Sequence, residues 1–215
     1  LEGIYFYNFT TPEFNVNICQ IPFWTLTVYY FWQCFKNDKV QNWILFGLFA
    51  ALGVLSKYLF VYLLIGILIF FIFKFKRNKK FNYKYFIPIV VFLLVLTPHF
   101  IWLIDNDFKT ITYGLKRATF EDGNFLNHLF YPLKFIFKQI GTLIPFFGLL
   151  FFIISKFKFR FKYSDEKLIY LASVSLMPIL LMLLTSMIFG ANIRTMWMTP
   201  FYLFFGLLFI YILES

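Results

Sequence analysis

The sequence predicts an all-α protein, a polytopic bundle of about seven transmembrane helices. Three observations predict this fold: apolar runs about one bilayer long, a low content of charge, and basic residues gathered in short blocks between the runs. Hydrophobic residues make up 61% of the 215 positions and charged residues only 14%, whereas soluble domains carry about 25% charged residues. We therefore expect an integral membrane protein.

The net charge of +10 would suggest a nucleic-acid partner if the protein were soluble. Here the lysines and arginines lie in blocks between apolar runs, which is the pattern that membrane topology alone requires. We therefore expect contact with the bilayer and no nucleic-acid partner.

The first predicted span is Ile18–Phe35, which follows a mixed aromatic and polar segment containing Glu13. The next apolar run, Trp43–Phe73, has about 31 residues, too many for one span of about 20. Its only charge is Lys57, near the centre. A lysine at the midplane of a single helix would cost several kcal/mol. We therefore predict two shorter helices that turn at Ser56 and Lys57.

A long polar segment interrupts the remaining apolar runs. Its second half, Asn124–Gln139, carries apolar residues at helical spacing on one side and polar residues largely on the other. This pattern predicts an outward helix lying in the membrane interface. Four apolar runs predict the other spans: Tyr85–Ile104, Ile140–Ser155, Leu168–Phe189 and Trp197–Leu213.

The distribution of basic residues orients these spans. Three loops hold 13 of the 20 lysines and arginines and are expected on the cytoplasmic side. This orientation is consistent only if the run around Lys57 crosses the membrane twice. Lys57, the segment Asp105–Arg117 and Trp197 would then face outward from the plasma (inner) membrane. The three loops are Lys36–Lys39, Lys74–Lys84 and Lys156–Lys167.

The outward polar groups are the candidates for chemistry. Lys57 could bind a lipid phosphate, or it could be a snorkelling lysine that fixes depth. Glu13 could act as a general base or a metal ligand, or it could be a solvated loop acid. Asp105 and Asp107 have the same possibilities or serve as helix caps, and Asp107 could instead form a plain ion pair with Arg117.

Two tryptophans, Trp102 and Trp197, suit an aromatic belt at the membrane surface. The sequence contains no Cys/His metal motif and no nucleotide-binding loop.

Four segments, in order from residue 11 to residue 202, together resemble one enzyme family. The first is Thr11-Pro12-Glu13 followed by Phe23-Trp24, which is similar to a T-P-D motif and an F-W pair, with Glu in place of the usual Asp. The second is Trp43, then Gly47-Leu48, then Gly53 to Tyr58 (GVLSKY), which is similar to W…G-L…G-L-x-x-L-S-K-Y.

The third segment contains Pro98, Trp102, Asp107 and Arg117 and resembles P-x-x-x-W-x-x-x-H-D-W with an Arg ten residues after the Asp. In this sequence Asn106 stands where His is common. The fourth, WMTPFY from Trp197, is similar to W-P-A-P-x-Y. The family is that of membrane glycosyltransferases of the dolichyl-phosphate-mannose protein mannosyltransferase and aminoarabinose transferase type, the GT-C type.

The resemblance implies transfer of a sugar from a polyprenyl-phosphate-linked donor to a lipid, glycan or protein acceptor on the extracytoplasmic face. It implies that Glu13 and Asp107 are catalytic carboxylates. Together with Asp105, they would serve the sugar or a divalent metal ion, and no other cofactor is expected. The residues expected to bind substrate are Lys57 and Arg117, which would hold the lipid phosphate, and Tyr58, Trp102, Asp105 and Trp197.

We treat residues 1–215 as a single domain and expect an N-terminally truncated fragment of that family, whose first outward loop lies upstream. Two other functions stay open. A transporter or flippase of a lipid-linked substrate would carry polar residues in mid-span on both halves of a repeat, and no internal repeat is visible. A non-catalytic assembly subunit would lack clustered ionisable groups.

Overall fold

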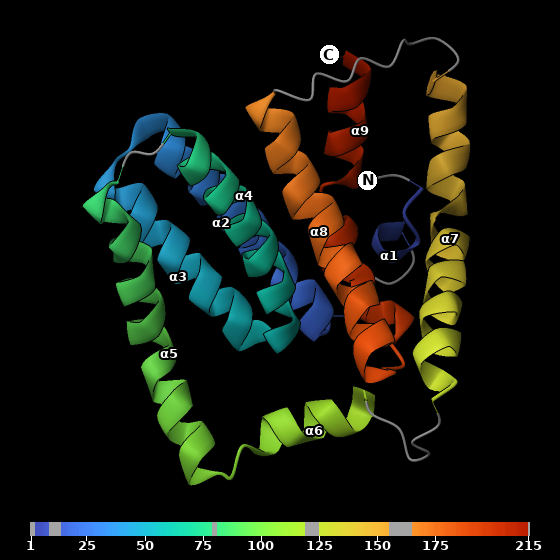
Figure 1. Ribbon diagram of the computed structural model, residues 1–215, viewed down its shortest axis with the longest axis horizontal. Coiled ribbons are helices and arrows are strands. Elements are labelled where there is room, and N and C mark those ends of the chain that lie inside the picture. The colour runs from blue at the N-terminus through green and yellow to red at the C-terminus, as the bar shows by residue number, and fades with distance from the viewer. Residues whose placement is uncertain (1–2, 9–13, 79–80, 119–124, 155–164, 215) are drawn as a thin grey trace. The chain divides into compact units, whose positions relative to one another are not determined.

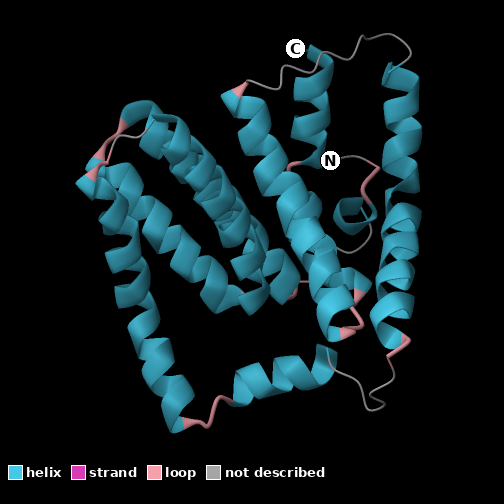
Figure 2. Ribbon diagram, viewed as in Figure 1, coloured by secondary structure: helices cyan, strands magenta, loops and turns pink. Residues whose placement is uncertain are grey.

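The computed structural model describes residues 3–8, 14–78, 81–118, 125–154 and 165–214. Every regular element in these ranges is a helix (Figure 2), which confirms the predicted all-α class. The chain divides into two compact units, one formed by residues 19–117 and the other by residues 1–18 together with 118–215.

The unit of residues 19–117 is organised around a helical hairpin. Figure 1 shows α3 and α4 running in opposite directions from a shared turn, with α5 leading into the short helix α6. The 3₁₀ helices η1 and η2 precede α4 and α5. The bounds are α2 (Val16–Asn37), α3 (Val40–Ser56), η1 (Tyr58–Phe60), α4 (Val61–Asn78), η2 (Tyr83–Phe86), α5 (Ile87–Asp105) and α6 (Lys109–Ala118).

The turn of the hairpin falls at Lys57, which confirms the break predicted from the length of the apolar run. Lys57 has an extended backbone (φ −168°, ψ 133°), so α3 ends at Ser56 and η1 starts at Tyr58. The Lys57 amide still donates a hydrogen bond to the Gly53 carbonyl, with an N···O distance of 3.2 Å.

Small residues on α3 let α5 approach closely. A Cβ atom on Gly47 would lie 2.5 Å from the carbonyl oxygen of Pro88, and one on Gly53 would lie 2.3 Å from the ring of Phe60. Gly47 therefore sets the distance between the backbones of α3 and α5, as small residues do in membrane helix packing, whereas Gly53 makes room for the Phe60 ring of η1.

The second unit contains two long helices and a bent helix pair. Asp165 caps α8 by accepting a hydrogen bond from the Lys167 amide at 2.9 Å, and the Tyr211 hydroxyl donates to the same carboxylate at 2.5 Å. These contacts join the start of α8 to α9. The bounds are α1 (Tyr5–Asn8), α7 (Asn127–Ile154), α8 (Glu166–Phe189), η3 (Thr195–Tyr202) and α9 (Phe205–Glu214).

The number of spans is lower than predicted. In the described ranges, four helices are long and apolar enough to cross a bilayer, or five if η3 and α9, bent by 44°, count as one span. All seven predicted spans are helical, but α3 has only 17 residues, about 26 Å of rise against a hydrocarbon core of about 30 Å. Helix α2 has sufficient length, but polar residues such as Gln20 and Thr27 make it less apolar.

The predicted boundary between an interfacial helix and a span was wrong. Asn124–Gln139 and Ile140–Ser155 were expected as separate elements, whereas α7 runs without a break from Asn127 to Ile154. Pro132 and Pro145 both lie inside this helix, and apolar helices in membranes tolerate proline. Among the described residues, α6 is instead a short amphipathic helix, with Lys116 and Arg117 in its last turn.

Hydrogen bonds of Asp38 connect the turn between α2 and α3 to the segment that precedes α5. Its carboxylate accepts hydrogen bonds from Lys84 at 2.8 Å and from the Trp43 indole at 3.1 Å, and Lys84 also donates to the Asp38 carbonyl at 2.7 Å. The hydrogen bond from Lys84 is the main reason why the pKa of Asp38 lies below its ordinary value. Asp38 also has a left-handed backbone (φ 44°), which aspartate and asparagine tolerate better than most residues.

We expect Asp38→Ala to destabilise the protein more than Asp38→Asn. Asparagine loses the partly exposed ion pair, worth at most about 1 kcal/mol, but keeps an acceptor for Trp43 and tolerates the left-handed backbone. Alanine should lose about 1 kcal/mol more because of that backbone. Thermal unfolding of the two variants in the same detergent measures the difference, and equal melting temperatures would contradict this account of the turn.

Candidate functional site

Lys57 presents a cation at the tip of the hairpin between α3 and η1. Its side chain is half-buried. Burial, and to a lesser extent the positive charge of Arg117, lower the pKa of Lys57 to about 8. A nearby anion would stabilise the ammonium form of Lys57, which burial and the charge of Arg117 both disfavour.

Tyr58 links three helices next to this cation. Its hydroxyl lies 2.8 Å from Nε2 of His99 on α5 and 2.7 Å from Oγ1 of Thr110 on α6. A hydroxyl can donate one hydrogen bond and accept another, so both bonds can form at the same time. The single hydroxyl of Tyr58 therefore holds the start of α6 against the tip of the hairpin.

Arg117 and Trp102 are oriented by neighbouring side chains of the same unit. The Arg117 guanidinium donates to the Tyr113 hydroxyl at 3.1 Å and lies 5.4 Å from the centre of the Tyr113 ring. The Trp102 ring stacks on His99, with centroids 5.9 Å apart and an interplanar angle of 11°. We call Lys57, Tyr58, His99, Trp102, Thr110 and Arg117 the hairpin-tip cluster.

The predicted carboxylates lie at the exposed turn between α5 and α6. Asp105 is the last residue of α5, and Asp107 follows in a left-handed conformation (φ 50°). Both side chains are exposed. Within the described ranges, no ion pair joins Asp107 to Arg117, and no group of three or more His, Cys, Asp or Glu side chains is arranged to hold a metal ion.

Four of the eight predicted site residues therefore belong to the hairpin-tip cluster. Glu13 lies outside the described residues, and Trp197 belongs to the other compact unit, in η3. His99 and Thr110 were missed as site residues. The position of His99 three residues before Trp102, on the same face of a helix, was the only signal that could have indicated it.

The fourth motif, from Trp197 to Tyr202, coincides with η3 and is tied down by buried tyrosines. Tyr202 donates to the Gln139 side-chain oxygen at 2.6 Å, and Tyr7 donates to the Thr199 carbonyl at 2.5 Å. The rings of Phe6 and Tyr202 stack with centroids 5.9 Å apart. These contacts hold α1 and α7 against η3, so in the described residues this motif has a structural role.

We expect Tyr58→Phe to raise the KM for the lipid-phosphate substrate that the sequence resemblance implies about tenfold, with a smaller change in kcat. The change removes the hydrogen bonds of the Tyr58 hydroxyl to α5 and α6 and so loosens α6, the helix that carries Arg117. A tenfold change in KM corresponds to about 1.4 kcal/mol, the scale of one or two such hydrogen bonds. Steady-state kinetics on both variants provide the measurement. Tyr83→Phe, at an exposed tyrosine of η2, is the matched control and should change neither constant.

The fold and this cluster define an integral membrane protein with a cationic, aromatic-lined site where a helical hairpin turns. Residues 1–102 match the family model of the dolichyl-phosphate-mannose-protein mannosyltransferases. The match confirms the resemblance drawn from the sequence and implies glycosyltransferase activity with a polyprenyl-phosphate-linked sugar donor. No curated protein and no solved structure was found to match the chain.

Proposed function

We propose that the protein transfers a sugar from a polyprenyl-phosphate donor to a lipid, glycan or protein acceptor on the extracytoplasmic face of the plasma membrane. The observation that carries the proposal is the position of Lys57. It is a half-buried cation close enough to Arg117 to be affected by its charge, at the turn of a hairpin between apolar helices. Such a place suits a phosphate whose lipid tail lies in the membrane.

The chemistry needs a cation because the donor's phosphate is the leaving group. The bond between the sugar's anomeric carbon and the phosphate oxygen breaks, and the lipid phosphate leaves with the electron pair. Lys57 and Arg117 would stabilise the charge that develops on this oxygen. Trp102 and Tyr58 border the same place, and aromatic faces of this kind can pack against a sugar ring.

The acceptor hydroxyl must lose a proton as it attacks the anomeric carbon, so a carboxylate base is required. We assign this role to Glu13 or Asp107. Asp105 is proposed to contact the sugar. A divalent metal ion held by the carboxylates is part of the proposal.

The experiment is a transfer assay with the full-length protein in liposomes, supplied with defined polyprenyl-phosphate sugars and membrane extract. Mass analysis of the products should show a lipid, glycan or protein that has gained the sugar. Donor carried across the bilayer without a glycosylated product would overturn the proposal and favour the transporter. A parallel reaction with EDTA tests the metal: unchanged turnover would remove the ion from the proposal.

The proposed face can be tested in intact cells. A Ser56→Cys substitution, in a background without Cys19 and Cys34, places a thiol beside Lys57 at the tip of the hairpin. A membrane-impermeant thiol reagent should label it from outside. Labelling only after the membrane is opened would contradict the extracytoplasmic assignment.

Donor binding should weaken as pH rises above about 8. The phosphodiester of the donor stays singly charged in this range, so Lys57 is the group that titrates, and its free pKa is about 8. The bound anion raises that pKa. The Kd should therefore be constant below pH 8 and then rise by up to about tenfold per pH unit until the pKa of the complex is reached. Lys57→Arg, which stays charged, should remove this dependence.

A further inference from the structure

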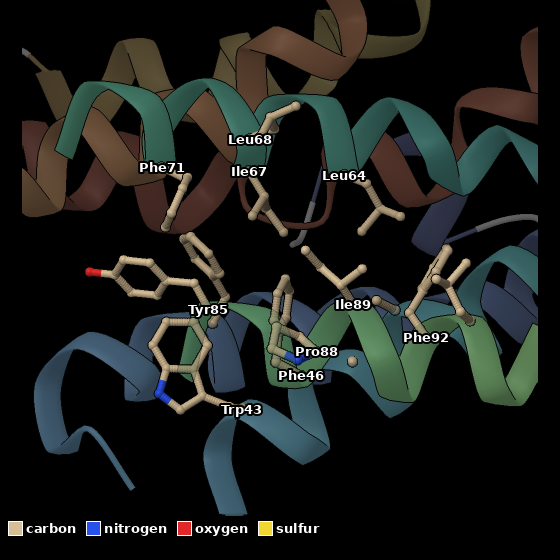
Figure 3. A pocket seen from close by; sticks show the side chains of 14 residues that line it. Trp43, Phe46, Leu64, Ile67, Leu68, Phe71, Tyr85, Pro88, Ile89 and Phe92 are labelled. Atoms are coloured by element: carbon tan, nitrogen blue, oxygen red, sulfur yellow. The ribbon is translucent and has the colours of Figure 1, made fainter. Parts of the chain in front are cut away.

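The 19–117 unit contains an apolar cavity of about 440 Å³ between α3, α4 and α5. Figure 3 shows Leu64, Ile67 and Phe71 of α4 facing Ile89 and Phe92 of α5 across this space. All fourteen lining residues are apolar or aromatic apart from glycine. The volume falls within the range of about 300–1,000 Å³ that is usual for ligand sites.

The cavity is separated from the hairpin-tip cluster. On α3 its lining ends at Ala50, about 10 Å of helix before Lys57. One turn further on, the fully buried ring of Phe60 lies against Gly53, so close that a Cβ there would meet it at 2.3 Å. On α5 the buried side chain of Leu96 follows the last lining residue. A chain entering from Lys57 would meet this packing.

The opposite end of the cavity is basic. Phe71 and Tyr85 line it there, and both rings contact Phe35, with centroids 6.3 and 6.5 Å apart. The Lys74 ammonium lies 4.6 Å from the centre of the same Phe35 ring. Lys84, adjacent to Tyr85, carries a second ammonium group at this end of the helices, and it pairs with the Asp38 carboxylate at 2.8 Å.

We propose that this cavity binds an anionic glycerophospholipid, with an acyl chain between α4 and α5 and the phosphate at Lys74. The site would lie in the leaflet that borders the basic segment Lys74–Lys84 and is distinct from the donor site at Lys57. Inside a bilayer an acyl chain gains little by leaving other lipid, so the charge of the headgroup determines which lipid is selected. A polyprenyl phosphate held at Lys57 would have its charge at the wrong end of the cavity.

The test uses purified full-length protein in nanodiscs with a phosphatidylglycerol that carries a photoreactive diazirine in one acyl chain. Mass spectrometry should find adducts on the lining segments of α4 and α5, at least fivefold more than with the same analogue of phosphatidylcholine. Equal labelling by the two lipids would overturn the proposal. So would preferential labelling of these segments by a photoreactive polyprenyl phosphate, since the donor's tail would then be the occupant.

Two variants address the cavity and the charge separately. Ile89→Trp fills the opening, and Lys74→Gln removes the headgroup partner; each should reduce phosphatidylglycerol adducts at least fivefold. Leu94→Trp, at an exposed position of α5 outside the lining, is the control and should leave the adducts unchanged. If Ile89→Trp does not fold, the Lys74→Gln variant still tests the proposal, because unchanged labelling of that variant would refute the site. Transfer activity at Lys57 is measured independently of either result.

Discussion

A Lys57→Met variant is expected to lose about 100- to 1,000-fold in sugar-transfer rate, the scale found when one charge-stabilising donor is removed from a reaction site. Methionine keeps an unbranched apolar stem, so the packing of the half-buried side chain is largely preserved. The loss should fall mainly on kcat, because the leaving phosphate needs the cation most in the transition state. Single-turnover transfer from a polyprenyl-phosphate sugar measures it.

The control is Lys109→Met, which removes an exposed lysine from the start of α6. This variant changes the net charge by the same amount near the same turn but removes no group of the hairpin-tip cluster. Its turnover should therefore stay within about twofold of wild type. A twofold change corresponds to about 0.5 kcal/mol, the limit expected for a surface substitution. Unchanged turnover in Lys57→Met itself would exclude Lys57 from the mechanism, whatever the control shows.

The break at Lys57 could be predicted from sequence because two independent constraints agreed. The apolar run was too long for one span, and its single charge could not lie at the bilayer centre. The extended backbone of Lys57 satisfies both. In contrast, the boundary between Gln139 and Ile140 was wrong because the amphipathic spacing before it was interpreted as a separate helix in the membrane interface, bent at Pro132. Both features are compatible with one continuous helix in apolar surroundings.

The hairpin-tip cluster could be predicted only in part. A lysine and an arginine near outward helix ends were visible as separate candidates, but their proximity depends on where α6 lies. That position is held by the Tyr58 hydroxyl, whose partners are 41 and 52 residues away in sequence. No local pattern encodes contacts over such separations. The exposed positions of Asp105 and Asp107 likewise follow from the left-handed turn after α5, which the sequence did not indicate.

The close approach of α3 and α5 predicts the largest effect on stability. Gly47→Ala should destabilise the protein by about 1–3 kcal/mol, because its Cβ would lie 2.5 to 3.0 Å from backbone atoms of Pro88 and the helices must separate to make room. Thermal denaturation in detergent, followed by size-exclusion chromatography, measures the loss.

The matched control is Gly141→Ala in α7, where a Cβ would meet no atom within 4 Å. Alanine favours helix over glycine by up to about 1 kcal/mol, so this variant should melt at or above the wild-type temperature. Equal stability of the two variants would show that the α3–α5 contact is not tight.

A separation of the helices at Gly47 should also affect function, because Lys57 follows the end of α3 and α5 carries His99. Donor binding should therefore weaken in Gly47→Ala even at temperatures where the protein remains folded.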